Sequence, residues 1–281
     1  MGRFSDVLLT VDFDRTLTAP DSTIPKRNIE AIEYFMAEGG AFTVNTGRSV
    51  PMYSSVLDAV PVNAPLLLYN GSAAYDKQTG ALSLCRPIDL DWRQVIARCH
   101  ELFPDLTVEL QGTKYHYTFR PNKKWEEFCD NNGCPWSYAT FQDDLGVFLK
   151  FTVYGEFHES TVSHLFRGTP QELERIKEAK ALIQQEFGGK VQVFESAPRI
   201  LDMHAVGVGK GHIARRLQAE LGRRHLVCVG DALNDLNMLQ AADYAFVPAD
   251  AALAPRFDNV CVCAQGAVAD VIYKKIPEIA G

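Results

Sequence analysis

The chain has 281 residues, a length at which a core domain and a second unit are expected. Hydrophobic residues make up 47% and charged residues 22%, which is ordinary for a globular protein. The formal net charge of −7 argues against non-specific nucleic-acid binding, which depends on cations that neutralise phosphates. No apolar run approaches the ~20 residues that span a bilayer, and no signal-peptide pattern opens the chain. We therefore expect a cytoplasmic monomer or small homo-oligomer with neither nucleic acid nor membrane as partner.

The first third of the chain alternates segments typical of strands with a segment typical of a helix. Three short apolar runs that end in polar residues predict strands covered on both faces: 6–11, 41–48 and 66–71. Between the first two runs, apolar residues at helical spacing predict a helix from Pro25 to about Glu38. This alternation indicates βαβ units and a parallel sheet.

The middle of the chain has a different pattern, in which polar and apolar residues alternate. Such alternation, rich in aromatic and β-branched residues, predicts a largely antiparallel sheet with one face covered. The predicted strands are 106–110, 115–119, 147–154 and 191–195, and the predicted helices are 91–103, 123–131 and 170–187.

The last part of the chain returns to the first pattern. Helices are predicted at 210–221, up to 241 and at 267–275, and strands at 225–230, 244–247 and 260–263. We therefore expect an α/β fold with a parallel-sheet core formed by residues 1–82 and 203–281. An α+β domain, residues 83–202, is inserted into this core.

The seven cysteines are an odd number in a chain too long to need a disulfide framework. No CxxC occurs, and the histidines show no H-E-x-x-H or other zinc spacing. We interpret all seven cysteines as reduced thiols.

Polar side chains follow three of the predicted core strands, at the strand ends where open α/β sheets bind ligands. These residues are Asp12 and Asp14, then Asn45, Thr46, Gly47 and Arg48, and finally Asp231, Asn234 and Asp235. Converging carboxylates repel one another unless a cation lies among them, and Mg²⁺ prefers such oxygen ligands. A hydroxyl, backbone N–H groups and Lys210, at the start of a predicted helix, would complete a phosphoryl pocket. The pattern predicts phosphoryl transfer with Mg²⁺ as cofactor.

Four segments resemble, in order, the motifs of the haloacid dehalogenase superfamily. The run from Asp12 to Thr16 is similar to its DxDxT signature, and Thr46-Gly47-Arg48 to its second motif. Lys210 and the run from Gly230 to Asp235 match the remaining motifs. The insertion resembles the type IIB cap of the Cof-like phosphatases. The resemblance covers nearly the whole chain and implies a Rossmann-like core with an α+β cap.

The resemblance also implies a chemical role for each residue. Asp12 would attack phosphorus and form an aspartyl-phosphate, while Asp14 would act first as an acid and then as a base. The implied Mg²⁺ ligands are Asp12, Asp14 through its main-chain carbonyl or its side chain, and Asp231, with Asp235 as support. The implied phosphate-binding residues are Phe13, Thr46, Gly47, Lys210 and Asn234. The implied substrate is a small phosphorylated metabolite such as a sugar phosphate.

Several of these residues also have simpler interpretations. Asp12 and Asp14 could cap a turn, and the run from Asp231 could be an ordinary helix N-cap. Arg48 and Asn70 lie beside the predicted pocket and either contact the substrate or serve the structure.

Two residues depart from the common family pattern. Arg15 stands where Gly is frequent in the signature, so its turn must accept a side chain. Asp250 stands where related phosphatases often carry Asn, which adds a negative charge. Neither change removes a catalytic group.

Two other functions remain open. The run DRTLTAP resembles the first motif of phosphomannomutases, which would pass the phosphoryl group to another hydroxyl instead of water. A non-enzymatic metabolite-binding module is the other alternative, although it would not need the full set of catalytic residues.

Overall fold

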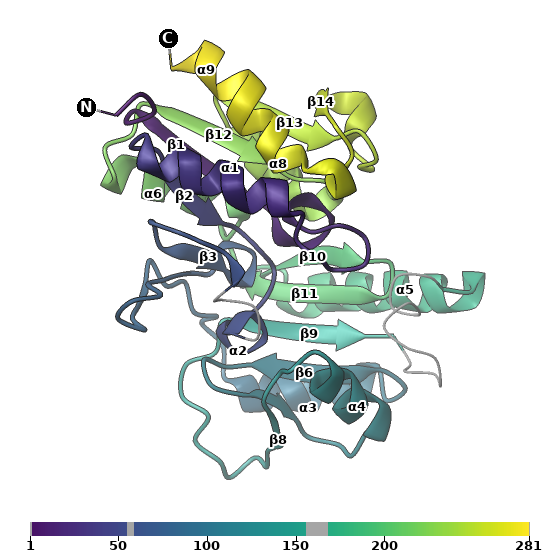
Figure 1. The fold of residues 1–281 in the computed structure, drawn as a ribbon. Helices are drawn as coiled ribbons and strands as arrows, with labels where there is room; N and C mark the ends of the chain where they lie inside the picture. The colour runs from purple at the N-terminus through teal and green to yellow at the C-terminus, as the bar shows by residue number, and fades with distance from the viewer. Residues whose placement is uncertain (1, 55–58, 156–167, 281) are drawn as a thin grey trace. The chain divides into compact units, whose positions relative to one another are not determined.

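The computed structural model describes residues 2–54, 59–155 and 168–280. It divides into two compact units, whose elements are labelled in Figure 1. The first unit contains Met1–Gly47, Val56–Leu84 and Gly209–Gly281, and the second contains Arg48–Ser55 and Cys85–Val208. The main segment of the second unit, Cys85–Val208, thus begins and ends a few residues later than the predicted insertion 83–202. The unit also includes Arg48–Ser55. The domain limits drawn from the sequence, 1–82, 83–202 and 203–281, remain a prediction.

A parallel sheet forms the centre of the first unit. Its order among the described residues is β14-β13-β12-β1-β2, and all neighbouring strands run parallel. The strands are β1 (Val7–Val11), β2 (Ala41–Val44), β12 (His225–Val229), β13 (Tyr244–Pro248) and β14 (Asp258–Val260). Every residue of β1 is buried, as expected for a strand with helices over both faces of its sheet. The predicted α/β class with a parallel-sheet core is confirmed.

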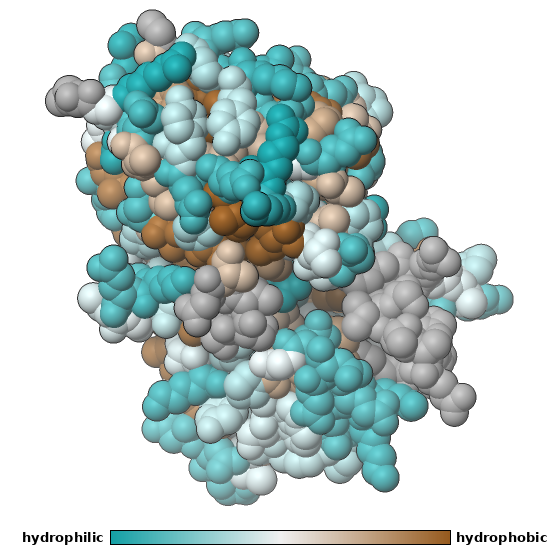
Figure 2. Space-filling model, viewed as in Figure 1, coloured by the Kyte–Doolittle hydropathy of each residue, from teal (hydrophilic) through white to brown (hydrophobic). Residues whose placement is uncertain are grey.

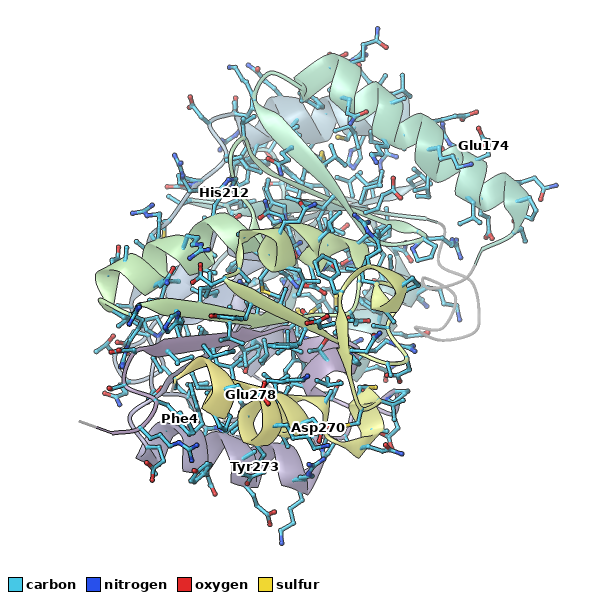
Figure 3. The ribbon with its side chains drawn as sticks, turned by 90° about the horizontal axis from the view of Figure 1, so that it is seen from above. Phe4, Glu174, His212, Asp270, Tyr273 and Glu278 are labelled. Carbon is cyan, nitrogen blue, oxygen red and sulfur yellow. The ribbon has the colours of Figure 1, made fainter. Side chains whose placement is uncertain are left out.

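Helices cover both faces of this sheet (Figures 1 and 3). One face carries α1 (Lys26–Ala37), α8 (Ala267–Asp270) and α9 (Ile276–Ile279), and the other carries α6 (Lys210–Glu220) and α7 (Leu236–Ala241). The rings of Tyr34 and Tyr273 stack with their centroids 5.7 Å apart, and Arg27 pairs with Asp270 at 2.8 Å. These contacts join α1 to the C-terminal helices, where Figure 3 labels Asp270 and Tyr273.

The segment 66–71, predicted as a further strand of the parallel sheet, forms a strand only over its first half and then a turn. β3 (Leu66–Leu68) pairs antiparallel with β4 (Ala73–Tyr75), which pairs with β5 (Leu82–Ser83) in a separate sheet. A parallel bridge between Asn45 and Leu67 connects β3 to the end of β2. The predicted strand is therefore present and parallel to the end of β2 at this bridge, but it is shorter than predicted, and its other neighbour is antiparallel because the chain turns back at Tyr69–Gly71.

The predicted strand 260–263 was also wrong in its extent. β14 ends at Val260 because the next N–H groups have other acceptors. The N–H of Cys263 donates to Asp250 Oδ1 at 2.9 Å, and the N–H of Cys261 donates to Asp270 Oδ2 at 3.4 Å. Cys263 therefore begins a turn, and Asp250 serves the structure by holding it.

A six-stranded sheet forms the centre of the second unit, in the order β10-β11-β9-β6-β7-β8. Its strands are β6 (Thr107–Gln111), β7 (His116–Thr118), β8 (Trp136–Tyr138), β9 (Lys150–Tyr154), β10 (Val191–Ala197) and β11 (Ile200–Ala205). The described pairs are antiparallel except for β7 with β8, which agrees with the predicted, largely antiparallel α+β unit.

The two faces of this sheet differ in chemistry. α3 (Trp92–Leu102) and α5 (Pro170–Phe187) pack on one face in an apolar core with Val108 and Leu110 of β6. Glu109 and Gln111 alternate with them and point to the opposite face, where α4 (Lys123–Asn131) brings Trp125 to Glu109. The short helix α2 (Val50–Ser54) also belongs to this unit. Hydrophilic residues dominate the surface of the second unit in Figure 2. Among the described helices, none combines the length and apolar character needed to cross a membrane.

Candidate active site

The acidic turns that follow β1 and β12 meet in the first unit. One carboxylate oxygen from each of Asp12, Asp231 and Asp235 lies within 4.8 Å of the other two, and all three residues are buried. β1 and β12 are parallel neighbours with Val11 beside Val229, so the residues that follow them reach the same edge of the sheet. Sheet topology thus brings together segments from opposite ends of the chain.

Lys210, the first residue of α6, is 1% exposed and lies between two of these acids. Its Nζ donates hydrogen bonds to Asp12 Oδ1 and to Asp235 Oδ1, each at 2.6 Å. Burial opposes the charge of the ammonium group, yet the two carboxylates outweigh it and raise the pKa of Lys210 above its ordinary value. The lysine is therefore a fixed positive charge at the centre of the cluster.

The cluster holds more negative charge than Lys210 compensates. Burial, together with the neighbouring Asp235, raises the pKa of Asp12 well above its ordinary value. The same two causes raise the pKa of Asp231 to about 7. Three closely spaced carboxylate oxygens with excess charge fit a hard divalent cation such as Mg²⁺, which takes oxygen ligands.

Hydrogen bonds from the turns themselves hold two of the acids in place. Asp235 Oδ2 accepts from the N–H groups of Asp231 and Ala232 at 3.1 Å each. Thr16 Oγ1 donates to Asp231 Oδ1 at 3.3 Å, which links the turn after β1 to the turn after β12. Sequence reasoning assigned no role to Thr16, although the last letter of DxDxT was the signal for it. A Cβ at Gly230 would lie 2.7 Å from the Cβ of Asp235, so this approach requires glycine.

The turn after β2 brings three of the predicted residues together. Thr46 and Asn70 are each 1% exposed, and the N–H of Asn70 donates to the carbonyl of Thr46 at 3.0 Å. A Cβ at Gly47 would lie 2.8 Å from Asn70 Oδ1, so Gly47 allows the amide side chain to approach the turn. Asn70 itself is held in a left-handed backbone conformation with φ of 52°.

Asn45 is a site residue that sequence reasoning placed in the turn without giving it a role. It is fully buried, and its Nδ2 donates to the main-chain carbonyl of Lys210 at 2.9 Å. This bond ties the turn after β2 to the start of α6. A polar residue directly before the Thr-Gly-Arg run was the feature of the sequence that could have indicated a role for Asn45.

A close contact between two backbone segments also positions Lys210. Gly71, at φ +97°, lies so near the start of α6 that an added Cβ would sit 2.5 Å from the carbonyl oxygen of Gly209. Only glycine combines this backbone angle with this approach. The turn Tyr69–Gly71 therefore supports the first turn of α6.

The remaining predicted residues lie outside the carboxylate cluster. Asp14 is exposed, and its charge contributes to the raised pKa of Asp12. Arg15 beside it has φ of 63°, the left-handed conformation that the frequent glycine would adopt without strain. Phe13 is buried in the same turn, and Asn234 is half-buried in the turn Leu233–Asp235. Arg48 groups with the second unit rather than with these residues.

Comparison with known proteins identifies the family. Residues 9–272 match the model of a haloacid dehalogenase-like hydrolase family. An HMP-PP phosphatase from Serratia proteamaculans is 24% identical over 282 residues, covering 93% of this chain and 92% of the relative. A haloacid dehalogenase-like hydrolase from B. subtilis has a similar fold, with a TM-score of 0.77, 17% identity and coverage of 95% and 99% of the two chains. A sugar phosphatase of HAD subclass IIB gives a TM-score of 0.74 at 16% identity, with 94% and 97% covered.

These solved structures bear on the fold alone because their identities are low. The family match covers nearly all of the strands and spans every segment of the carboxylate cluster. The chain belongs to the haloacid dehalogenase-like hydrolases.

Proposed function

We propose that the protein is a Mg²⁺-dependent phosphatase that hydrolyses a small phosphorylated metabolite, such as a sugar phosphate, through an aspartyl-phosphate on Asp12. The observation that carries this proposal is the buried carboxylate cluster, in which Asp12 Oδ1 lies 2.6 Å from Lys210 Nζ. A carboxylate in such a position can act as a nucleophile that divides hydrolysis into two steps.

Mg²⁺ would be held by Asp12, by Asp231 and by Asp14 through its main-chain carbonyl or its side chain, with Asp235 as support. When bound, the ion would neutralise these carboxylates and the oxygens of the phosphoryl group. The raised pKa values of Asp12 and Asp231 support this assignment, because a cation is what their ionised forms require.

Asp14 would protonate the leaving oxygen and then take a proton from the attacking water. Its carboxyl group is not part of the three-carboxylate cluster, and it lies on an exposed turn that water can reach. This separation supports a division of labour between a buried nucleophile and an accessible acid–base group.

The phosphoryl oxygens would be bound by the hydroxyl group of Thr46, the N–H groups of Phe13 and Gly47, and the side chains of Lys210 and Asn234. The positive charge of Lys210 would stabilise the negative charge that develops during transfer. Arg48 and Asn70 are proposed as substrate contacts.

The substrate class is suggested by the named relatives. One of them is an HMP-PP phosphatase, whose name states a phosphorylated substrate. We infer the same class for this chain without choosing a compound.

Phosphate release from a panel of sugar and nucleotide phosphates, with Mg²⁺ or with EDTA, tests the proposal. We expect turnover on at least one sugar phosphate that stops with EDTA and returns when Mg²⁺ is added. A folded, Mg²⁺-loaded protein that releases no phosphate from any compound would contradict it. Conversion of mannose-1-phosphate to its isomer without phosphate release would instead favour the mutase alternative.

A further inference from the structure

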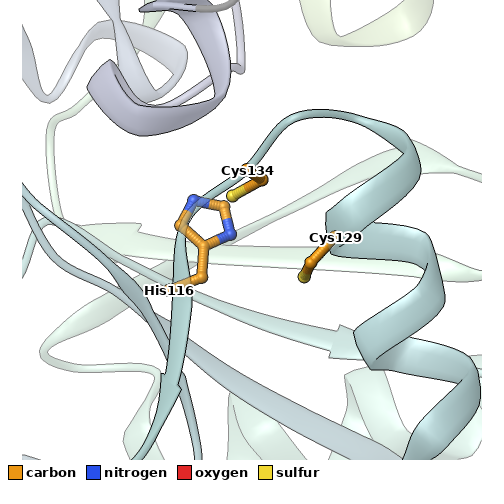
Figure 4. A group of neighbouring side chains, drawn as sticks. All are labelled: His116, Cys129 and Cys134. Atoms are coloured by element: carbon orange, nitrogen blue, oxygen red, sulfur yellow. The ribbon is translucent and has the colours of Figure 1, made fainter.

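The second unit contains a separate group of metal-ligating side chains. His116 lies on β7, Cys129 near the end of α4, and Cys134 in the turn before β8 (Figure 4). A ring nitrogen of His116 and the two Sγ atoms all lie within 4.8 Å of one another. All three residues are buried, at 0%, 0% and 3% exposure. The group shares no residue with the carboxylate cluster of the first unit.

The local sequence explains why the two cysteines meet. α4 ends in a Schellman motif, in which the N–H of Cys134 donates to the carbonyl of Cys129 at 2.9 Å and that of Gly133 to the carbonyl of Asp130 at 3.0 Å. Gly133 supplies the required left-handed conformation, with φ of 60°. This motif places side chains five residues apart in contact. Two apolar residues would satisfy it, so the turn alone does not account for a histidine beside two thiols.

His116 supplies the second, independent observation. Its Nε2 lies 2.6 Å from Ser49 Oγ, so this nitrogen has a polar partner. Its Nδ1 forms no hydrogen bond of normal geometry with any described group, although Glu109 Oε1 lies 3.1 Å away. Both ring nitrogens therefore face a polar group, the hydroxyl of Ser49 on one side and the carboxylate of Glu109 on the other. A metal-binding histidine usually keeps one nitrogen on such an outer partner and gives the other to the ion, so a bound ion would take the place of one of these two contacts.

Glu109 supplies negative charge on the same side of the ring. It is completely buried, and Trp125 Nε1 donates to its Oε2 at 2.6 Å. Tyr154 and Gln111 donate to it as well. A carboxylate fixed in this way can serve as a fourth ligand or as an outer partner of the histidine.

We propose that His116, Cys129 and Cys134 bind a zinc ion in the second unit, with Glu109 as the neighbouring oxygen donor. Two thiolates and an imidazole are ligands that zinc accepts, whereas Mg²⁺ and Ca²⁺ take oxygen. The spacing Cys-x₄-Cys lies within the range of structural zinc pairs. Such an ion would join α4, β7 and the turn before β8, and so would stabilise this end of the sheet.

Metal content and Co²⁺ spectroscopy test the zinc site on the full chain. Protein prepared with Zn²⁺ under reducing conditions should contain about one zinc per chain by mass spectrometry. Replacement by Co²⁺ should give sulfur-to-cobalt charge-transfer bands and the intense visible bands of a tetrahedral site. Cys129→Ser and Cys134→Ser should each lower the zinc content at least about tenfold.

Matched controls separate the site from general effects of cysteine loss. Cys99→Ser changes a fully buried cysteine in the other core of the same unit, and Cys85→Ser changes an exposed one; both should keep their zinc. Asp12→Asn should also keep zinc, so failure of the phosphatase proposal would leave this one standing. Reduced, folded wild-type protein that binds no zinc, or that gives no thiolate bands with Co²⁺, would overturn the proposal. A Cys129–Cys134 disulfide in protein isolated under reducing conditions would overturn it too.

Discussion

Lys210 in the first unit and Lys150 in the second are both buried lysines that contact aspartates, but their surroundings differ. Lys210 lies among three clustered carboxylates, and the pKa values of Asp12 and Asp231 are raised. Lys150 Nζ lies 3.4 Å from Asp202, whose carboxylate also accepts from Thr152 at 2.8 Å. Burial opposes ionisation of Asp202, yet Lys150 and these hydrogen bonds outweigh it and lower the pKa of the carboxyl.

The difference distinguishes a site from a structural pair. A carboxylate that the fold satisfies stabilises the protein when it ionises, and its pKa falls. Carboxylates in excess destabilise the protein until a cation arrives, and their pKa values rise. Lowered carboxyl pKa values are found at Asp202, in the sheet of the second unit. Raised values are found at Asp12 and Asp231, at the strand ends of the first unit. Removing a carboxylate should therefore change the free energy of unfolding with opposite signs in the two places.

The largest expected effect is on catalysis. Asp12→Asn removes the proposed nucleophile but keeps its size, so phosphate release should fall at least about a thousandfold. Steady-state assays with the best substrate of the panel measure it. Asp258→Asn, at an exposed position of β14, is the control and should retain activity. A variant at Asp12 with a tenth of wild-type activity or more would exclude the aspartyl-phosphate route.

Removal of Lys210 should have the largest effect on stability. Lys210→Met leaves buried carboxylates without their counter-charge and should lower the free energy of unfolding by about 3–5 kcal/mol at pH 8 in EDTA. The loss should shrink at pH 5, because the raised pKa values let the acids take up protons there. Urea denaturation at both pH values measures this. Lys274→Met, whose side chain is 62% exposed, should cost far less, and equal losses would refute the charge argument.

A loss of stability is also expected when the ion pair in the second unit is broken. Asp202→Asn leaves Lys150 buried without its charged partner and should lower the free energy of unfolding by about 2–4 kcal/mol at pH 7. Because the folded pKa of Asp202 is lowered, its contribution is present above its ordinary value of 3.8 and is lost as the pH falls below it. The free energies of unfolding of the wild type and the variant should therefore become similar in acid. A constant difference between pH 7 and pH 3 in urea denaturation would contradict the pairing.

The smallest effect has the opposite sign. Asp231→Asn removes a carboxylate whose pKa is raised to about 7, so its ionised form costs stability as the pH rises from about 4 through 7. At pH 8 in EDTA the variant should be more stable than wild type by about 1–2 kcal/mol, while Mg²⁺ should no longer raise its melting temperature. Thermal unfolding with and without Mg²⁺ measures both. Destabilisation in EDTA, as for Asp202→Asn, would remove the distinction between the two sites.

The sequence predicts much of this molecule where local pattern and topology agree. α4 and α5 begin and end at the predicted residues, because Asn122 and Thr169 cap them and polar and apolar positions alternate at helical spacing. The cluster of Asp12, Asp231 and Asp235 was predicted as a site, because the ends of parallel strands meet at one edge. Its division into roles stays a prediction.

Other features depend on contacts that no local pattern carries. The antiparallel pairing of β4 with β3 depends on residues 69–71, which have left-handed backbone conformations. Two of them, Tyr69 and Asn70, are not glycine. The early end of β14 depends on the side chains of Asp250 and Asp270, which accept from the N–H groups of Cys263 and Cys261 just after the strand. The group at His116 was missed because its histidine lies on β7, ahead of the helix and turn that carry the cysteines, while Cys-x₄-Cys alone is a weak signal.

The contact between Gly71 and the start of α6 makes the ammonium group of Lys210 sensitive to a residue that has no chemical function of its own. Adding one methyl group at position 71 would push against the main chain at Gly209 and move the first turn of the helix. Activity could thus be tuned, or lost, by a change that leaves every acidic and basic group in the protein intact. A survey of harmful substitutions that looks only at ionisable residues would overlook this position.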